Sequence, residues 1–104
     1  MFRAFRTEWY EKKLKKLSDE EQKIVEKIEQ DLKQNPLSGK PLGYSFFRER
    51  KFDGNRIYFL VYLAPKVIFL ITISDKKAQQ QVIDLIKANL DIYKDQMDRI
   101  LKNL

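Results

Sequence analysis

The segment 45–74 constrains the fold of this chain more than any other part of the sequence. It reads SFFRERKFDGNRIYFLVYLAPKVIFLITIS, in which two turn signals separate three strand-like stretches. The first stretch alternates charged with apolar or aromatic residues, and the next two are strongly apolar. The turn signals are Asp53-Gly54-Asn55 and Ala64-Pro65-Lys66. The pattern predicts a three-stranded antiparallel meander.

Composition limits both the size of the fold and its chemistry. The chain has 104 residues, 43% of them hydrophobic and 35% charged, which predicts one folded domain over residues 1–104. A net charge of +6 favours polyanionic partners, although a solvated basic surface explains it as well. The chain contains no histidine and no cysteine. We therefore expect no metal and no cofactor, and any catalysis must use Lys, Arg, Tyr, Asp or Glu.

The sequence shows no targeting or membrane segment. No stretch has the basic, apolar and small-residue order of a signal peptide. The longest apolar run, 57–73, is interrupted by Ala64-Pro65-Lys66, which is not compatible with a membrane helix. We expect a cytoplasmic protein without a membrane partner.

The N-terminal part predicts a short strand followed by two helices. Residues 2–6 are expected to form an edge strand, and Thr7 to cap a helix that begins at Glu8. Residues 18–21 (SDEE) form a capping box for a second helix, which Asn35-Pro36 ends. Its apolar stripe is expected to consist of Ile24, Val25, Ile28 and Leu32. The two helices should form an αα-hairpin on one sheet.

Residues 36–44 hold two of the three prolines and two of the three glycines, and they predict a loop. From Asp75 onward apolar residues recur at helical spacing almost to the C-terminus, which predicts a helix of about 25 residues. A small domain cannot easily bury all of it. We expect its second half, from about Asp91, to contact a partner or a second copy, giving a homodimer through this helix. The predicted fold class is α+β.

The turn between the first two meander strands decides which residues share a face of the sheet. A three-residue loop would pair Phe52 with Arg56, and a two-residue loop would pair it with Asn55. The shorter loop places Arg50 beside Ile57 on the core face, where a guanidinium is costly to bury.

We therefore expect the three-residue loop, since Gly and Asn both tolerate the left-handed conformation with which it closes. This register gathers four residues on one outer face of the sheet, namely Arg48, Arg50, Arg56 and Tyr58. Guanidinium groups held on a rigid sheet are suited to binding phosphate. Alternating charged and apolar residues are also what any half-exposed strand shows.

With these elements in this order, the chain resembles the RelE/ParE superfamily of toxin–antitoxin toxins. The resemblance covers most of the chain. It rests on the order of the elements and on three local runs: KKLKKL before a capped helix, NPLSGKPLG between helix and sheet, and RERKFDGNRIYFLVY ahead of an apolar strand.

The resemblance implies a toxin of a type II toxin–antitoxin module that acts as a ribosome-dependent mRNA endonuclease. Such toxins need no metal, because the 2′-hydroxyl of the RNA attacks the adjacent phosphate and leaves a 2′,3′-cyclic phosphate. The implied partners are a cognate antitoxin that wraps the toxin, the ribosome and mRNA.

The resemblance also assigns catalytic positions. Arg56 matches the arginine that follows the first turn, and Lys76 or Lys77 matches a basic residue after the last strand that contacts phosphate or acts as general acid. The family usually carries a Tyr or His a few residues further on, as the base, where this chain has AQQQVI at 78–83. Tyr58 is the expected substitute, although a tyrosine of ordinary pKa is a poor base.

RNA contacts are expected from the strands and the first helix. Arg48 and Arg50 match the alternating basic pair of the family, and Lys51 adjoins them. Tyr58 and Tyr62 are the residues expected to stack on bases. Lysines of the first helix are expected to follow RNA phosphates, although a solvated helix face is equally compatible with Lys12, Lys13 and Lys16.

The mismatch at 78–83 favours an alternative function. A ParE-like or catalytically degenerate toxin would bind its target or its antitoxin without cleaving RNA.

Overall fold

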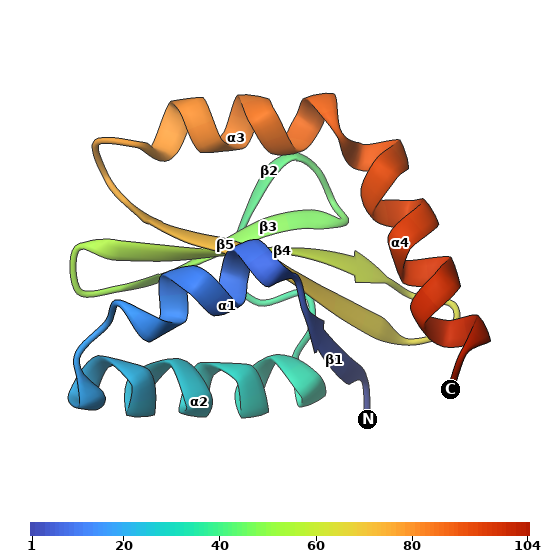
Figure 1. Ribbon diagram of the computed structural model, residues 1–104, viewed down its shortest axis with the longest axis horizontal. Coiled ribbons are helices and arrows are strands. Elements are labelled where there is room, and N and C mark those ends of the chain that lie inside the picture. The colour runs from blue at the N-terminus through green and yellow to red at the C-terminus, as the bar shows by residue number, and fades with distance from the viewer.

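A five-stranded sheet lies between two pairs of helices in the computed structural model, which describes residues 1–104 (Figure 1). The elements in chain order are β1 (Arg3–Arg6), α1 (Glu8–Lys15), α2 (Asp19–Gln34), β2 (Lys40–Tyr44), β3 (Phe47–Phe52), β4 (Asn55–Tyr62), β5 (Val67–Asp75), α3 (Gln79–Ala88) and α4 (Leu90–Lys102). None of these helices is both long enough and apolar enough to cross a membrane.

The strand order is β1-β5-β4-β3-β2, with β1 parallel to β5 and the other neighbours antiparallel. The predicted edge strand and the predicted meander are confirmed. The meander is one strand longer than predicted, because β2 forms inside the stretch 36–44 that the sequence assigned to a loop. Pro41 is compatible with a strand there because β2 lies at the edge of the sheet.

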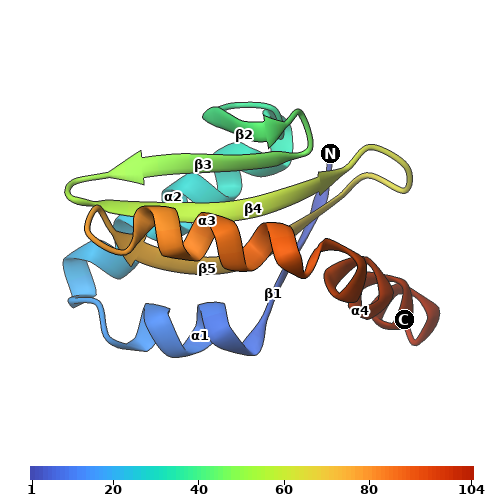
Figure 2. The ribbon, with the colours of Figure 1, turned by 90° about the horizontal axis from the view of Figure 1, so that it is seen from above.

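Both faces of the sheet are buried. One face packs under α1 and α2, where Leu32 and Val25 meet Ile57 and Phe59 of β4. The opposite face packs under α3 and α4, where Ile86 and the other buried residues of those helices meet β4 and β5 (Figure 2). The central strands therefore read as continuous apolar runs.

The N-terminal helices begin where the sequence predicts. The Thr7 hydroxyl accepts a hydrogen bond from the Tyr10 backbone N–H at 3.0 Å. Ser18 and Glu21 form the predicted capping box, with both reciprocal bonds at 3.1 Å. One residue of the expected stripe is misplaced, because Ile24 is 37% exposed and lies at the margin of the contact between α2 and the sheet.

The predicted C-terminal helix is two helices, which meet at Asn89. Asn89 has φ −123° and ψ 20°, and its side-chain amide donates to the Leu85 carbonyl at 2.8 Å. Asparagine favours such local bonds over a continuous helix. The chain changes direction there, and α4 returns to its own sheet with Met97 only 1% exposed (Figure 2). The apolar stripe that predicted a homodimer through this helix is thus largely covered within one molecule.

The β3–β4 hairpin has the two-residue loop, and the predicted three-residue register is wrong. Phe52 pairs with Asn55, and Asp53 adopts φ 50°. A short loop with Asp-Gly is a strong hairpin signal, and aspartate tolerates positive φ. The expected cost of burying Arg50 does not arise, because this side chain reaches Asp31 at the end of α2.

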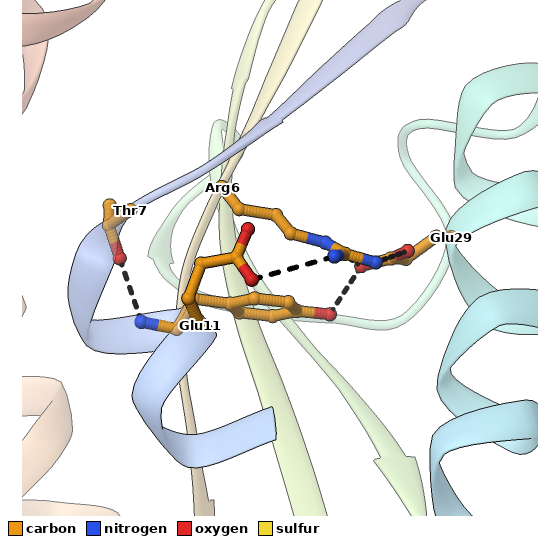
Figure 3. Close-up of polar contacts among 5 residues, drawn as sticks. Arg6, Thr7, Glu11 and Glu29 are labelled. Atoms are coloured by element: carbon orange, nitrogen blue, oxygen red, sulfur yellow. Dashed lines mark hydrogen bonds and ion pairs between the residues drawn. The ribbon is translucent and has the colours of Figure 1, made fainter. Parts of the chain in front are cut away.

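A polar network joins β1, α1 and α2 (Figure 3). Arg6 donates to both carboxylate oxygens of Glu29, at 3.0 and 2.7 Å, and the Tyr10 hydroxyl donates to Glu29 at 2.7 Å. Glu11 adds a longer ion pair to Arg6 at 3.7 Å. Glu29 is only 7% exposed, so this paired arrangement is what makes its burial tolerable.

Replacing Tyr10 should change how stability depends on pH. Burial, followed by the charge of Glu29, raises the pKa of Tyr10 well above its usual range. The folded protein therefore keeps this proton above pH ~10, where the unfolded chain loses it, so the free energy of unfolding falls as pH rises above that value. Tyr10→Phe should make the fall shallower, and should cost about 1–2 kcal/mol at pH 7 by removing the hydrogen bond to Glu29.

Urea unfolding between pH 7 and 11 measures both effects. Tyr44→Phe, at an exposed tyrosine, is the matched control and should leave both quantities unchanged. An unaltered pH slope in Tyr10→Phe would contradict this account of the network.

Candidate functional site

The observed register separates the arginines that the sequence placed together. Arg50 pairs with Ile57 and Arg48 with Phe59, on the face that α1 and α2 cover. Arg56 and Tyr58 lie on the opposite face, toward α3. No single outer face carries all four residues, and the expected arginine cluster on one face is therefore wrong.

Arg48 and Arg50 donate hydrogen bonds to α2 and to the segments on either side of β2. Arg50 donates to Asp31 at 2.8 Å and to Ser38 at 2.9 Å, and its hydrogen bond lowers the pKa of the Asp31 carboxyl. Arg48 donates to the Ser45 and Gly39 carbonyls at 3.0 and 3.2 Å. Both guanidinium groups therefore have a structural use that accounts for their positions.

Arg56 is buried at the end of the sheet where α3 begins. It is 7% exposed, and its Nε lies 3.7 Å from a carboxylate oxygen of Glu49, which is 1% exposed. Gln79 of α3 donates to both carboxylate oxygens of Glu49, at 2.8 and 3.2 Å. The Nε of Arg56 has no hydrogen-bond partner, although it is fully covered. Buried donors in native proteins are rarely left without an acceptor.

Neither tyrosine is placed as the sequence predicted. Tyr58 is 0% exposed and shares a hydrogen bond with Ser74 at 2.8 Å, so it presents no face on which a base could stack. Burial raises its pKa, which makes it a still poorer base.

Tyr62 lies at the far end of β4, roughly 20 Å from Arg56 at the usual rise per strand residue. Burial, with a smaller effect of Asp98, raises its pKa to about 12. Lys94 of α4 covers its ring at 5.7 Å. Tyr62 therefore does not belong to the same site as Arg56.

Four cationic side chains gather at the end of the sheet that holds Arg56. Lys51 pairs with Arg56 across the hairpin, Arg56 pairs with Ser74, and the chain leaves β5 through Lys76 and Lys77. The three lysines are exposed and form no ion pair. We call this set the cationic cluster: Lys51, Arg56, Lys76 and Lys77.

The N-terminus of α3 adds free donors to the cationic cluster. Ala78 precedes the helix and provides no side-chain cap, whereas the Asp75 carboxylate accepts a hydrogen bond from the Ala78 N–H at 3.0 Å. The first turn of the helix itself contains no acidic residue. The backbone N–H groups of Gln80 and Gln81 have no acceptor. A helix N-terminus with free N–H groups favours an anion, and the lysines beside it add to that preference. The arrangement is suited to a phosphate group.

The lysines of the first helix form a separate surface. Lys12, Lys13 and Lys16 belong to α1 and its C-cap, which cover the face of the sheet opposite α3. Lys12 is paired with Glu8 at 3.3 Å. The structure does not bring these lysines together with the cationic cluster.

No protein-family model and no curated protein matches the chain. Solved structures do match. The isolated RelE toxin of E. coli gives a TM-score of 0.65 at 17% identity, over 83% of this chain and 99% of that one. A chain of the RelBE2 toxin–antitoxin complex of Mycobacterium tuberculosis gives 0.65 at 18% identity, over 72% and 98%. The intact E. coli RelBE complex gives 0.60 at 19%, over 72% and 96%.

The chain has the RelE fold. This result confirms the RelE-like fold and the α+β class that were predicted from the sequence. At these sequence identities the likeness shows the fold alone. The role of each residue must therefore be argued from its own contacts in this structure.

Sequence reasoning missed Glu49 and Gln79 as parts of the site. The shorter loop would have revealed Glu49, because in that register it shares a face with Lys51 and Arg56. Gln79 carries no comparable signal, since its contact depends on how α3 packs over the sheet. The two residues hold Arg56 and α3 together at the cationic cluster.

Removing the counter-charge of Arg56 should destabilise the protein. Glu49→Gln leaves the guanidinium buried without a carboxylate, which should lower the free energy of unfolding by about 3 kcal/mol. Adding Arg56→Met should recover much of this loss, because no unpaired charge remains. Urea unfolding measures each variant.

Asp31→Asn breaks the partly exposed pair with Arg50 and is the matched control, with an expected cost of about 1 kcal/mol or less. If Glu49→Gln costs no more than Asp31→Asn, Arg56 and Glu49 do not form a buried pair in solution.

Proposed function

We propose that this chain is the toxin of a type II toxin–antitoxin module and that it binds RNA phosphate through the cationic cluster. The observation that carries the proposal is the position of this cluster on a RelE fold, at a helix N-terminus where the Gln80 and Gln81 N–H groups have no acceptor. The partners are a cognate antitoxin, the ribosome and mRNA. The charge of the chain, +6, agrees with a polyanionic target.

For the reaction, we propose ribosome-dependent cleavage of mRNA without a metal. The 2′-hydroxyl passes its proton to a water molecule as its oxygen attacks the adjacent phosphorus. The bond from phosphorus to the 5′ oxygen breaks, and a 2′,3′-cyclic phosphate forms. Lys51 and the N-terminus of α3 stabilise the charge that develops on the phosphate oxygens, and the buried Arg56 adds positive charge from beneath the site. Lys76 or Lys77 gives a proton to the departing 5′ oxygen.

Tyr58 is unsuitable as a base for the 2′-hydroxyl, because it is buried and its pKa is raised, so the proton goes to water and not to a side chain. This observation, together with the engaged side chains of Arg48 and Arg50, favours a second candidate function. The second candidate is a ParE-like or degenerate toxin that binds its target through the cationic cluster without cutting RNA.

Induced expression in bacteria tests the proposal. The wild-type chain should arrest growth, and Lys76→Ala/Lys77→Ala should relieve the arrest by removing two cations from the phosphate site. In purified translating ribosomes, the same change should lower mRNA cleavage by about 100-fold or more, by comparison with the loss of other charge-stabilising groups. Mapping of 3′ ends should find cyclic phosphates.

Lys12→Ala/Lys16→Ala removes the same charge from α1 and is the matched control, expected to retain both activities. Growth arrest that depends on Lys76 and Lys77 without RNA cleavage would identify the second candidate as correct. A wild-type chain that neither arrests growth nor cuts RNA would overturn the toxin assignment.

A further inference from the structure

Arg56 has hydrogen-bond donors that the fold leaves unused. Its guanidinium makes one hydrogen bond within the protein, from Nη1 to the Gly54 carbonyl at 3.4 Å. Its Nε is fully covered and has no acceptor. Its Nη2 also has no acceptor but is not fully covered, so the exposed 7% of Arg56 includes this end of the side chain. A guanidinium carries five N–H donors, and most of those of Arg56 therefore remain free.

The carboxylate nearest to Arg56 is engaged by another side chain. One oxygen of Glu49 lies 3.7 Å from the Arg56 Nε, which is too long for a hydrogen bond. Both oxygens of Glu49 accept hydrogen bonds from the Gln79 amide, at 2.8 and 3.2 Å. An arginine and a carboxylate commonly form two short, parallel hydrogen bonds. Gln79 therefore occupies the oxygens with which Arg56 would pair most closely.

The same chain contains a buried arginine–glutamate pair of the close kind. Arg6 donates to the two carboxylate oxygens of Glu29 at 3.0 and 2.7 Å. No amide side chain competes there, since the other hydrogen bond to Glu29 comes from the Tyr10 hydroxyl. The two pairs consist of the same residue types in one sheet and its covering helices. The difference between them is the amide of Gln79.

The contact between Gln79 and Glu49 lies at the anion-binding end of α3. Gln79 is the first residue of this helix, and the next two residues, Gln80 and Gln81, have free backbone N–H groups. Because Arg56 and Gln79 both contact Glu49, the unused donors of Arg56 and of α3 lie at the same end of the sheet. This arrangement suits a single anion that accepts from both sets of donors.

We propose that Gln79 is a positioning residue of the phosphate site, which holds Glu49 away from Arg56 and so keeps the Nη2 donor of Arg56 available to a bound phosphate. Without the Gln79 amide, Glu49 would close on Arg56 as Glu29 closes on Arg6, and the guanidinium would be neutralised within the protein. The inference rests on the proposed function in that RNA supplies the phosphate.

The test titrates inorganic phosphate into the full chain and follows the Gln80 and Gln81 amides by NMR. Gln79→Leu removes the amide and keeps a side chain of similar size. It should raise the Kd for phosphate about tenfold or more, because one hydrogen bond to a charged group is lost. The Arg56 Nε–H should also exchange with solvent more slowly, because a carboxylate then accepts from it.

Gln22→Leu is the matched control. It removes another half-buried glutamine, whose amide donates to the Leu17 carbonyl at 3.1 Å on the opposite side of the sheet. It should change neither the phosphate affinity nor the Arg56 signal. If Gln79→Leu weakens binding but leaves the exchange of the Arg56 Nε–H unchanged, Gln79 only anchors α3 to the sheet, and the proposal is overturned.

The remaining outcomes separate this inference from the proposed function. Phosphate binding that Lys76→Ala/Lys77→Ala abolishes and Gln79→Leu leaves intact would overturn the inference and keep the phosphate site. A wild-type chain that does not bind phosphate would overturn both. Because no step measures toxicity or RNA cleavage, a chain that behaves as expected here but neither arrests growth nor cuts RNA would keep the inference and lose the toxin assignment.

Discussion

The pairing of β3 with β4 through a two-residue loop sets the arrangement of almost every other part of the molecule. Side chains alternate along a strand, so a shift by one residue would exchange the two faces of β3. In the observed register, Phe52 joins the core under α1 and α2, while Phe47 and Glu49 face α3. The same register places Lys51 beside Arg56. The cationic cluster and both hydrophobic cores therefore depend on one short turn.

Both faces of the sheet are covered by helices, and this explains which members of the cationic cluster are buried and which are exposed. A sheet covered on one side would expose Arg56 and Tyr58, as the sequence suggested. Here α3 and α4 cover that side, and a guanidinium beneath α3 requires a carboxylate partner, which Glu49 supplies. The groups that remain free to meet an anion are those at the margin, namely the three lysines and the first N–H groups of α3.

The sequence predicted the elements of the fold better than their assembly. Helix starts are local, because Thr7 and the SDEE run bond to the first turns of their own helices, and both were predicted correctly. The break at Asn89 and the strand β2 were missed. At Asn89 the apolar spacing continues without interruption. β2 is held by pairing with β3, which no local pattern in a Pro/Gly-rich stretch reveals.

The predicted site depended on the free-energy cost expected for burying the Arg50 guanidinium, and the structure shows that this cost does not arise. Burial of Arg50 argued against the shorter loop, but Asp31 and Ser38 lie where this side chain leaves the sheet. Those partners belong to α2 and the following loop, more than ten positions away in sequence. Long-range partners of this kind are not visible in a strand pattern, and they reverse the balance between the two registers.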